Sequence, residues 1–137
     1  MPPEMQAFAN GFPVALLQAL ITLVILLAGV AVHGLLSPYK EVDHIREGNA
    51  AAAVSFGGVV LGLALPLSRS LTASTSAIET AIWGVAATVV TLLLFRVIDM
   101  LLKGLPQRVQ EGEVSAAALV VAAKLAVALV LGAAFSG

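Results

Sequence analysis

The sequence predicts an all-α integral membrane protein whose four transmembrane helices form two parallel tandem helical-hairpin repeats. Three observations predict this class. First, 60% of the 137 residues are hydrophobic and only 11% are charged, with a mean hydropathy of +1.04. Second, four apolar segments each have the length of a bilayer-spanning helix, which is roughly 20 residues. Third, a short charged motif occurs twice, each time between two of these segments.

The four apolar segments are expected to be the four spanning helices. They run from about 12 to 36, 50 to 68, 77 to 102 and 114 to 135. The helices of a soluble bundle are amphipathic, and a soluble domain carries about 25% charged residues. The composition of this chain therefore fits a membrane protein better than a soluble bundle. We expect residues 1–137 to form a single membrane domain, with repeat 1 at about 12–69 and repeat 2 at about 77–135.

The first apolar segment is expected to stay in the mature protein. A signal peptide has a basic start and a short apolar run. Residues 1–11 contain no Lys or Arg, and the apolar run after them is long. We therefore interpret it as a retained helix.

The links between segments predict breaks and an orientation. Pro38 and Pro106 should end the first and third helices, because the residue before a proline avoids the helical region. Residues 40–47 should form a short interfacial helix, and residues 69–78 a polar link that ends with Ser76 and Glu79 as a capping box. Basic residues concentrate in the two repeat-motif loops, which carry Lys40, Arg46, Lys103 and Arg108. Positively charged loops stay in the cytoplasm, so both termini should lie outside it.

The repeated motif is Ile45-Arg46-Glu47-Gly48-Asn49 in the first half and Val109-Gln110-Glu111-Gly112-Glu113 in the second. Each copy leads into an Ala-rich helix start. Residues 45–53, followed by Gly57, Gly58 and Gly62, resemble the bacterial domain-of-unknown-function family 350. The resemblance covers nearly the whole chain, and it implies a small four-helix inner-membrane protein without a settled activity. The second copy departs from the pattern at Glu113, where the first has Asn49.

Six residues are interpreted as the core of the repeat motif and as helix caps. They are Glu47, Gly48 and Asn49 in the first copy and Glu111, Gly112 and Glu113 in the second. Asn49 is a good N-cap because its side-chain oxygen accepts a bond from a free amide of the first helical turn. The alternative is an ion site at two paired helix starts. The three glutamates oppose an anion there, so we expect no phosphate site.

Gly58 and Gly62 form a GxxxG motif in the second apolar segment. Small residues at this spacing let helices approach closely in lipid. We expect a homo-oligomer that packs partly through this face, although the motif itself does not distinguish packing within one chain from packing between chains.

Lys124 interrupts the fourth apolar segment well inside the membrane, where a charge costs at least about 2.5–3.5 kcal/mol. Arg96 and Asp99 are the charged residues that can meet it. We expect Lys124 to pair with Asp99, with Arg96 competing for the carboxylate. This intramembrane charge cluster is interpreted either as an interhelix clasp or as an ion- or proton-coupling site.

The residue inventory contains no set that predicts an enzyme, a cofactor or a metal site. There are no cysteines, only two histidines, and no serine–histidine–acid set or phosphate loop. A net charge of −1 argues against nucleic acid as a partner. The sequence favours a non-enzymatic bacterial inner-membrane protein that is an oligomeric channel, transporter subunit or permeability element. The alternative is an accessory or scaffold protein that docks cytoplasmic partners in a membrane-maintenance or stress system.

Overall fold

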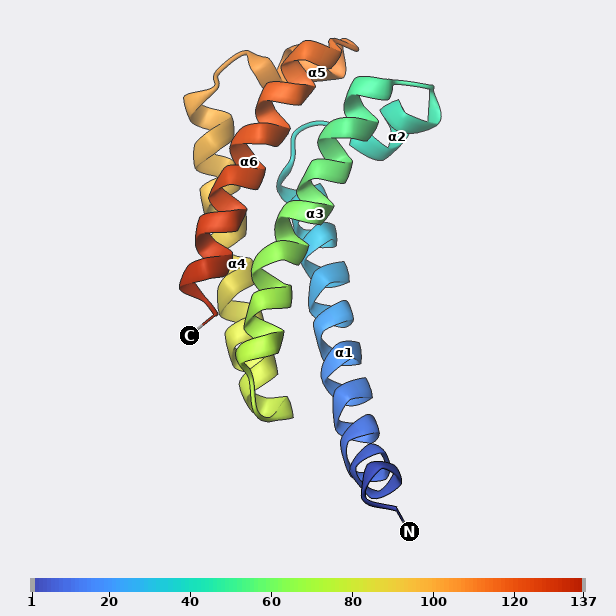
Figure 1. Ribbon diagram of the computed structural model, residues 1–137. Helices are drawn as coiled ribbons and strands as arrows, with labels where there is room; N and C mark the ends of the chain where they lie inside the picture. The colour runs from blue at the N-terminus through green and yellow to red at the C-terminus, as the bar shows by residue number, and fades with distance from the viewer. Residues whose placement is uncertain (1, 137) are drawn as a thin grey trace.

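The fold was analysed in a computed structural model, which describes residues 2–136. Within them the chain forms six helices: α1 (Pro3–Leu36), α2 (Glu41–Arg46), α3 (Ala50–Ala73), α4 (Ala77–Leu101), α5 (Leu105–Gln110) and α6 (Val114–Ala134). Helices α1, α3, α4 and α6 are long and apolar enough to cross a membrane. Helices α1 and α4 run toward the end that carries α2 and α5, and α3 and α6 run away from it (Figure 1). We call the end with α2 and α5 the corner end; the termini point toward the opposite end.

Two helix boundaries differ from the prediction. Helix α1 begins at Pro3 rather than near residue 12, because Pro3 fits the first helical position and Glu4 lies in the first turn. Helix α3 continues to Ala73 rather than ending near residue 68. Hydroxyls in this polar end bond to backbone carbonyls one turn earlier, as Thr72 does to Arg69 at 2.8 Å. The polar link is thus shorter than predicted.

The α3–α4 link contains half of the predicted capping box. Ser76 Oγ accepts a bond from the backbone amide of Glu79 at 3.1 Å. The Glu79 carboxylate does not return the bond to residue 76, but accepts one from the hydroxyl of Thr75 at 2.8 Å. The break before Pro38 agrees with the prediction, since α1 ends at Leu36. The third long helix ends at Leu101, but Pro106 does not cause the break: Leu105 and Pro106 begin α5, and the chain turns before them at Gly104, whose φ is +92°.

The chain turns from α2 into α3, and from α5 into α6, through two corners of the same backbone geometry. We call residues 47–49 the first corner and residues 111–113 the second. Gly48 and Gly112 have φ values of +90° and +92°, which non-glycine residues rarely adopt. In both corners the glycine amide bonds three residues back and the next amide bonds five residues back. This is the Schellman motif, in which a left-handed residue ends a helix; here the residue after it begins the next one.

Helices α3 and α6 make the most extensive interface, and α4 and α1 pack beside them. Glycines allow this close contact. A Cβ atom at Gly58 would lie 2.6 Å from Val121 Cγ2, and one at Gly62 would lie 2.6 Å from Phe95 Cζ. The expectation that this face packs between subunits is therefore wrong, because α6 and α4 of the same chain already fill it.

Helix α1 is the least enclosed of the four long helices. It extends beyond the others at its N-terminal end (Figure 1), and its apolar side chains, such as Phe8 and Phe12, are exposed. At a rise of 1.5 Å per residue its 34 residues span about 51 Å, well beyond the hydrocarbon thickness. Only its C-terminal half packs against the other helices, as where Gly29 faces Thr88 of α4.

Candidate functional site

The charged side chain of Lys124 is buried inside the bundle and paired with a carboxylate. Its Nζ atom lies 3.0 Å from Asp99 Oδ1, and the two side chains are 4% and 24% exposed. The ammonium also lies 5.6 Å from the centre of the Phe95 ring, a distance at which a cation is attracted to an aromatic face. The pair joins α6 to α4, as the sequence predicts.

Arg96 does not compete for this carboxylate. It is exposed on α4, and the ion pairs found among residues 2–136 include none with Arg96. The reason is burial, since the exposed guanidinium is solvated without a partner, whereas the buried ammonium needs one. The predicted cluster is therefore a pair, with Arg96 beside it.

The ion pair lines a cavity of about 320 Å³ at the corner end. The walls come from the α1–α2 link and from helices α2 to α6. Its polar lining includes Tyr39, Glu41, Ser55, Arg96, Asp99, Lys103, Gln110 and Lys124. One to two turns farther from the corners, the apolar core of Val59, Leu63, Phe95 and Ala128 fills the bundle. The cavity thus belongs to one end of the molecule only.

A second buried polar pair lies next to this cavity. His33 Nε2 is 3.3 Å from Glu41 Oε1, and the side chains are 8% and 10% exposed. His33 lies in the last turn of α1 and Glu41 begins α2, so the pair closes the link that contains Pro38. Glu41 lines both the cavity with Lys124 and a second cavity of about 360 Å³ beside His33. Its Oε2 atom is buried and has no hydrogen-bond partner among the described residues, and neither has Gln110 Oε1.

The two corners close the cavity end with different side-chain chemistry. Asn49 Oδ1 accepts a bond from the Ala52 amide at 3.0 Å, which is the predicted N-cap. Its Nδ2 atom donates to the backbone carbonyl of Gln110 at 2.9 Å. One amide side chain therefore caps α3 and ties the first corner to the end of α5.

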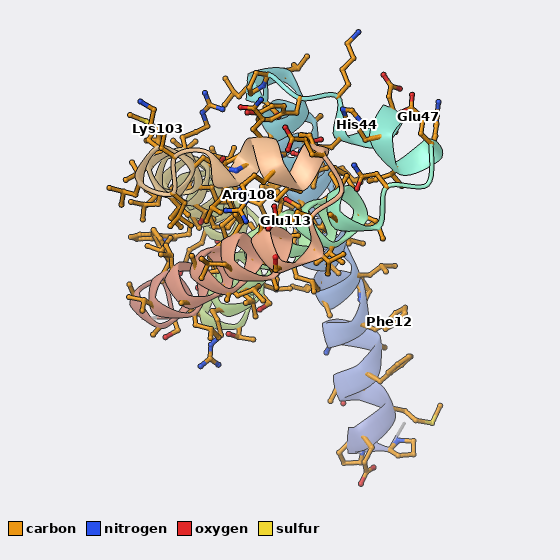
Figure 2. All side chains as sticks on the ribbon, turned by 90° about the horizontal axis from the view of Figure 1, so that it is seen from above. Phe12, His44, Glu47, Lys103, Arg108 and Glu113 are labelled. Atoms are coloured by element: carbon orange, nitrogen blue, oxygen red, sulfur yellow. The ribbon has the colours of Figure 1, made fainter. Side chains whose placement is uncertain are left out.

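In the second corner, Glu113 makes no cap bond. Its carboxylate forms a two-pronged ion pair with Arg108, whose Nε donates to Oε2 at 2.6 Å, and the two side chains lie together in Figure 2. The hydrogen bond from Arg108 holds the pKa of Glu113 below its ordinary value. The carboxylate in turn raises the pKa of Arg108 further above its ordinary range.

The remaining residues of the repeated motif lie at the surface. Glu47 and Glu111 are exposed helix C-caps. Glu47 lies 3.9 Å from His44 Nδ1, one turn earlier, and both residues stand at the outer edge of α2 in Figure 2. Neither glutamate lines the cavity with Lys124, so the motif contributes to this cavity through Gln110 and, indirectly, through Asn49.

Sequence reasoning missed the His33–Glu41 pair and the Asn49–Gln110 bond. The first pair spans a proline break, and the second joins residues from opposite halves of the chain, so no helical spacing relates the partners. The motif position of Gln110 was the only available signal for the second.

Comparison with known proteins gives the family. The profile of the Domain of Unknown Function (DUF350) family matches residues 7–135, so the chain belongs to this family, and the resemblance noted for residues 45–53 is confirmed. The chain is 28% identical over 78 residues to UPF0719 inner membrane protein YjfL of Escherichia coli (strain K12), covering 57% of this chain and 59% of that protein. It is 31% identical over 72 residues to UPF0719 transmembrane protein YshE of Bacillus subtilis (strain 168), covering 53% and 54%. The chain thus spans less than two thirds of these relatives. No solved structure matches it significantly.

Proposed function

We propose that this DUF350 family member is a non-enzymatic protein of the bacterial inner membrane that carries a small ion, as a transporter subunit, channel or permeability element. The observation that carries the proposal is the buried Lys124–Asp99 pair in the wall of a polar cavity. Ionisable groups within membrane spans are costly, and they mark ion and substrate pathways. The inner membrane is the location named for the YjfL relative.

The position of the cavity indicates the kind of pathway. It lies at the corner end, and the core around Val59, Leu63 and Phe95 fills the bundle beyond it. A single chain in this conformation thus offers a vestibule rather than a continuous pore. Passage requires either a second conformation or a path between copies, and we include a homo-oligomer in the proposal. The copies would meet through faces other than that of Gly58 and Gly62.

The same proposal includes the tandem repeat and the orientation. The corners at Gly48 and Gly112 have matching φ values and the same pattern of backbone bonds, which supports two copies of one hairpin unit. The basic residues Lys40, Arg46, Lys103 and Arg108 lie at the corner end, which supports a cytoplasmic corner end and outside termini. Alkaline phosphatase fused after Gly137 should be active, and activity of a cytoplasm-only reporter there would reverse the orientation.

Ion flux in proteoliposomes tests the function. The purified protein should carry a current or move a pH-dye signal that is absent from empty vesicles, and Lys124→Met should reduce it at least tenfold. The exposed pair supplies a matched control, since Arg108→Met lies outside the cavity wall and should keep the flux. Absence of flux for all small ions, in vesicles where circular dichroism shows folded protein, would contradict the proposal.

The alternative is a scaffold that docks a soluble partner. One observation favours it, namely the surface of exposed charges formed at the corner end by Asp43, Arg46, Glu47, Arg108 and Glu111. Charge reversal at Arg46 and Glu47 should then release a co-purifying soluble protein while leaving any flux unchanged.

A further inference from the structure

Two of the three basic side chains in the cavity wall have no ion-pair partner. The charged residues of the wall are Arg96, Lys103, Lys124, Glu41 and Asp99. The ion pairs found within residues 2–136 include Lys124 but neither Arg96 nor Lys103. We propose that Arg96 and Lys103 bind the phosphodiester headgroup of an anionic phospholipid in the leaflet at the corner end. This binding goes beyond ion carriage and does not depend on it.

The charged side chains of the wall leave an excess of one positive charge. Three of them are cationic and two are carboxylates. A phosphodiester group carries one negative charge, and it cancels this excess by Coulomb attraction. A zwitterionic headgroup cancels nothing, because its own cationic group already neutralises the phosphate. The wall therefore favours a lipid such as phosphatidylglycerol over phosphatidylcholine.

The positive excess lies on the exposed side of the cavity, which we call the mouth. Arg96 and Lys103 are exposed, and Lys103 stands at the edge of the molecule in Figure 2. Deeper in the wall, the side chain of Glu41 is only 10% exposed. Glu41 Oε2 and Gln110 Oε1 are buried without a hydrogen-bond partner among the described residues. Acceptor oxygens repel an anion, so the phosphate should stay at the mouth.

The spacing of the two cations suits one phosphate between them. Arg96 lies about one and a half turns before the end of α4, and Lys103 lies two residues after that end. Their positions are thus about 10 Å apart along the helix, and both have long stems that can bring the charged groups together. The guanidinium offers two parallel N–H groups to two phosphate oxygens, and the ammonium adds a point charge. Tyr39 and Gln107 line the same cavity and carry further donors.

The apolar surface next to the mouth indicates a lipid rather than a soluble phosphate. Met100 lies between the two cations in the chain and lines the same cavity. Leu93, Val97 and Met100 are exposed, and their spacing of four and three residues places them on one face of α4. A phospholipid can place its chains along this face while its headgroup reaches the cations. Basic pockets between membrane helices bind anionic headgroups in this way.

Native mass spectrometry of the full-length protein in a mild non-ionic detergent tests the inference. The two probes are dioleoyl phosphatidylglycerol and dioleoyl phosphatidylcholine, which have the same chains and differ in net charge. A basic residue near a membrane surface strengthens the binding of an anionic lipid by about fivefold. With two such residues, phosphatidylglycerol should bind at least about tenfold more tightly than phosphatidylcholine.

The basic residues of the corner end provide matched variants. Arg96→Gln and Lys103→Gln should each weaken the binding of phosphatidylglycerol by about fivefold, and the double variant by about twentyfold. The binding of phosphatidylcholine should not change. Arg46→Gln removes the same charge from an exposed position at the same end that does not line the cavity, and it should keep the affinity of the parent.

Cross-linking of the unmodified protein avoids any variant that fails to fold. A phosphatidylglycerol with a photoreactive headgroup should label residues 96–107 and spare residues 69–83 at the opposite end. Excess unlabelled phosphatidylglycerol should remove the label, whereas inorganic phosphate at the same concentration should not.

Three results would overturn the inference. The first is equal affinity for the two lipids, and the second is a loss of binding in Arg46→Gln as large as that in Arg96→Gln. The third is removal of the label by inorganic phosphate, which would assign a soluble anion to the same two cations.

Discussion

The first and second corners have one backbone and two different chemistries. In both, a left-handed glycine ends a six-residue helix and the next residue begins a long one. The first corner uses that residue, Asn49, to reach across the molecule to Gln110. The second uses Glu113 locally, in an exposed pair with Arg108. The glycine therefore sets the shape, and the residue after it decides whether the corner joins the two halves.

The two halves also differ in the ion pairs that they place next to the corners. The first half supplies the His33–Glu41 pair and the second half supplies the Asp99–Lys124 pair, and the cavity lies where the two halves meet. Each half thus contributes one carboxylate, but the partner of Glu41 is an imidazole and the partner of Asp99 is a lysine side chain. If this difference matters, substitutions that remove a side-chain contact should change the stability of the protein by different amounts in the two halves. Substitutions that change only the backbone conformation should change it by the same amount.

The largest effect is expected for the buried pair of the second half. Asp99→Asn leaves the Lys124 ammonium buried without a counter-charge, and should destabilise the protein by roughly 3 kcal/mol, near the lower end for broken buried pairs because Asp99 is partly exposed. Adding Lys124→Met should recover much of that loss. Thermal unfolding in detergent measures the single and double variants. Additive losses would show that the two residues act independently.

The next effect concerns the interface that joins the helices after the two corners. Gly58→Leu should cost about 1–3 kcal/mol or more, because its side chain would overlap Val121 of α6. The matched control is Gly57→Leu, where a Cβ meets nothing within 4 Å, and it should stay near the stability of the parent. Equal unfolding temperatures for the two variants would contradict the observed packing.

The two glycines of the corners should respond alike. Gly48→Ala and Gly112→Ala each place a methyl group on a backbone with φ near +90°, at positions where a Cβ meets nothing within 4 Å. The cost is therefore conformational alone, about 1–2 kcal/mol at each site. Chemical unfolding in mild detergent compares them. A difference of more than half that cost would show that the corners are not equivalent in their backbones.

The residues after the glycines should respond differently. Asn49→Asp keeps the acceptor that caps α3 but loses the donor to Gln110, which should cost about 1 kcal/mol. Asn49→Ala loses both and should cost about 2 kcal/mol. Glu113→Ala removes no cap and no bond between the halves, so its effect should be the smallest of the three. An Asn49→Asp protein as stable as the parent would show that the hydrogen bond from Asn49 to Gln110 does not stabilise the contact between the two halves.

The smallest effect is a pH dependence of the second corner. The pKa of Glu113 is lowered by the hydrogen bond from Arg108, so this pair contributes stability above the ordinary glutamate pKa of about 4.3. That contribution is lost as the pH falls through the lower pKa of the folded state. Unfolding temperatures between pH 7 and pH 3 should therefore fall less steeply for Glu113→Gln than for the parent. Parallel profiles would show that the pair adds no measurable stability, as many exposed pairs do not.

The sequence alone determined the four long apolar helices, the break before Pro38, the caps at Asn49 and Ser76, and the family. These follow from composition and from local rules, because a spanning segment must be apolar along its length and a cap bonds within one turn. The Lys124–Asp99 pair was also predictable, since a buried charge needs a counter-charge and few were in reach. Only the tertiary structure decided that Gly58 and Gly62 pack inside the chain, that Arg96 stays outside the pair, and that His33 and Glu41 lie beside a cavity. Those outcomes depend on which helix faces fit together, and side-chain volumes in three dimensions set that fit, which sequence spacing does not record.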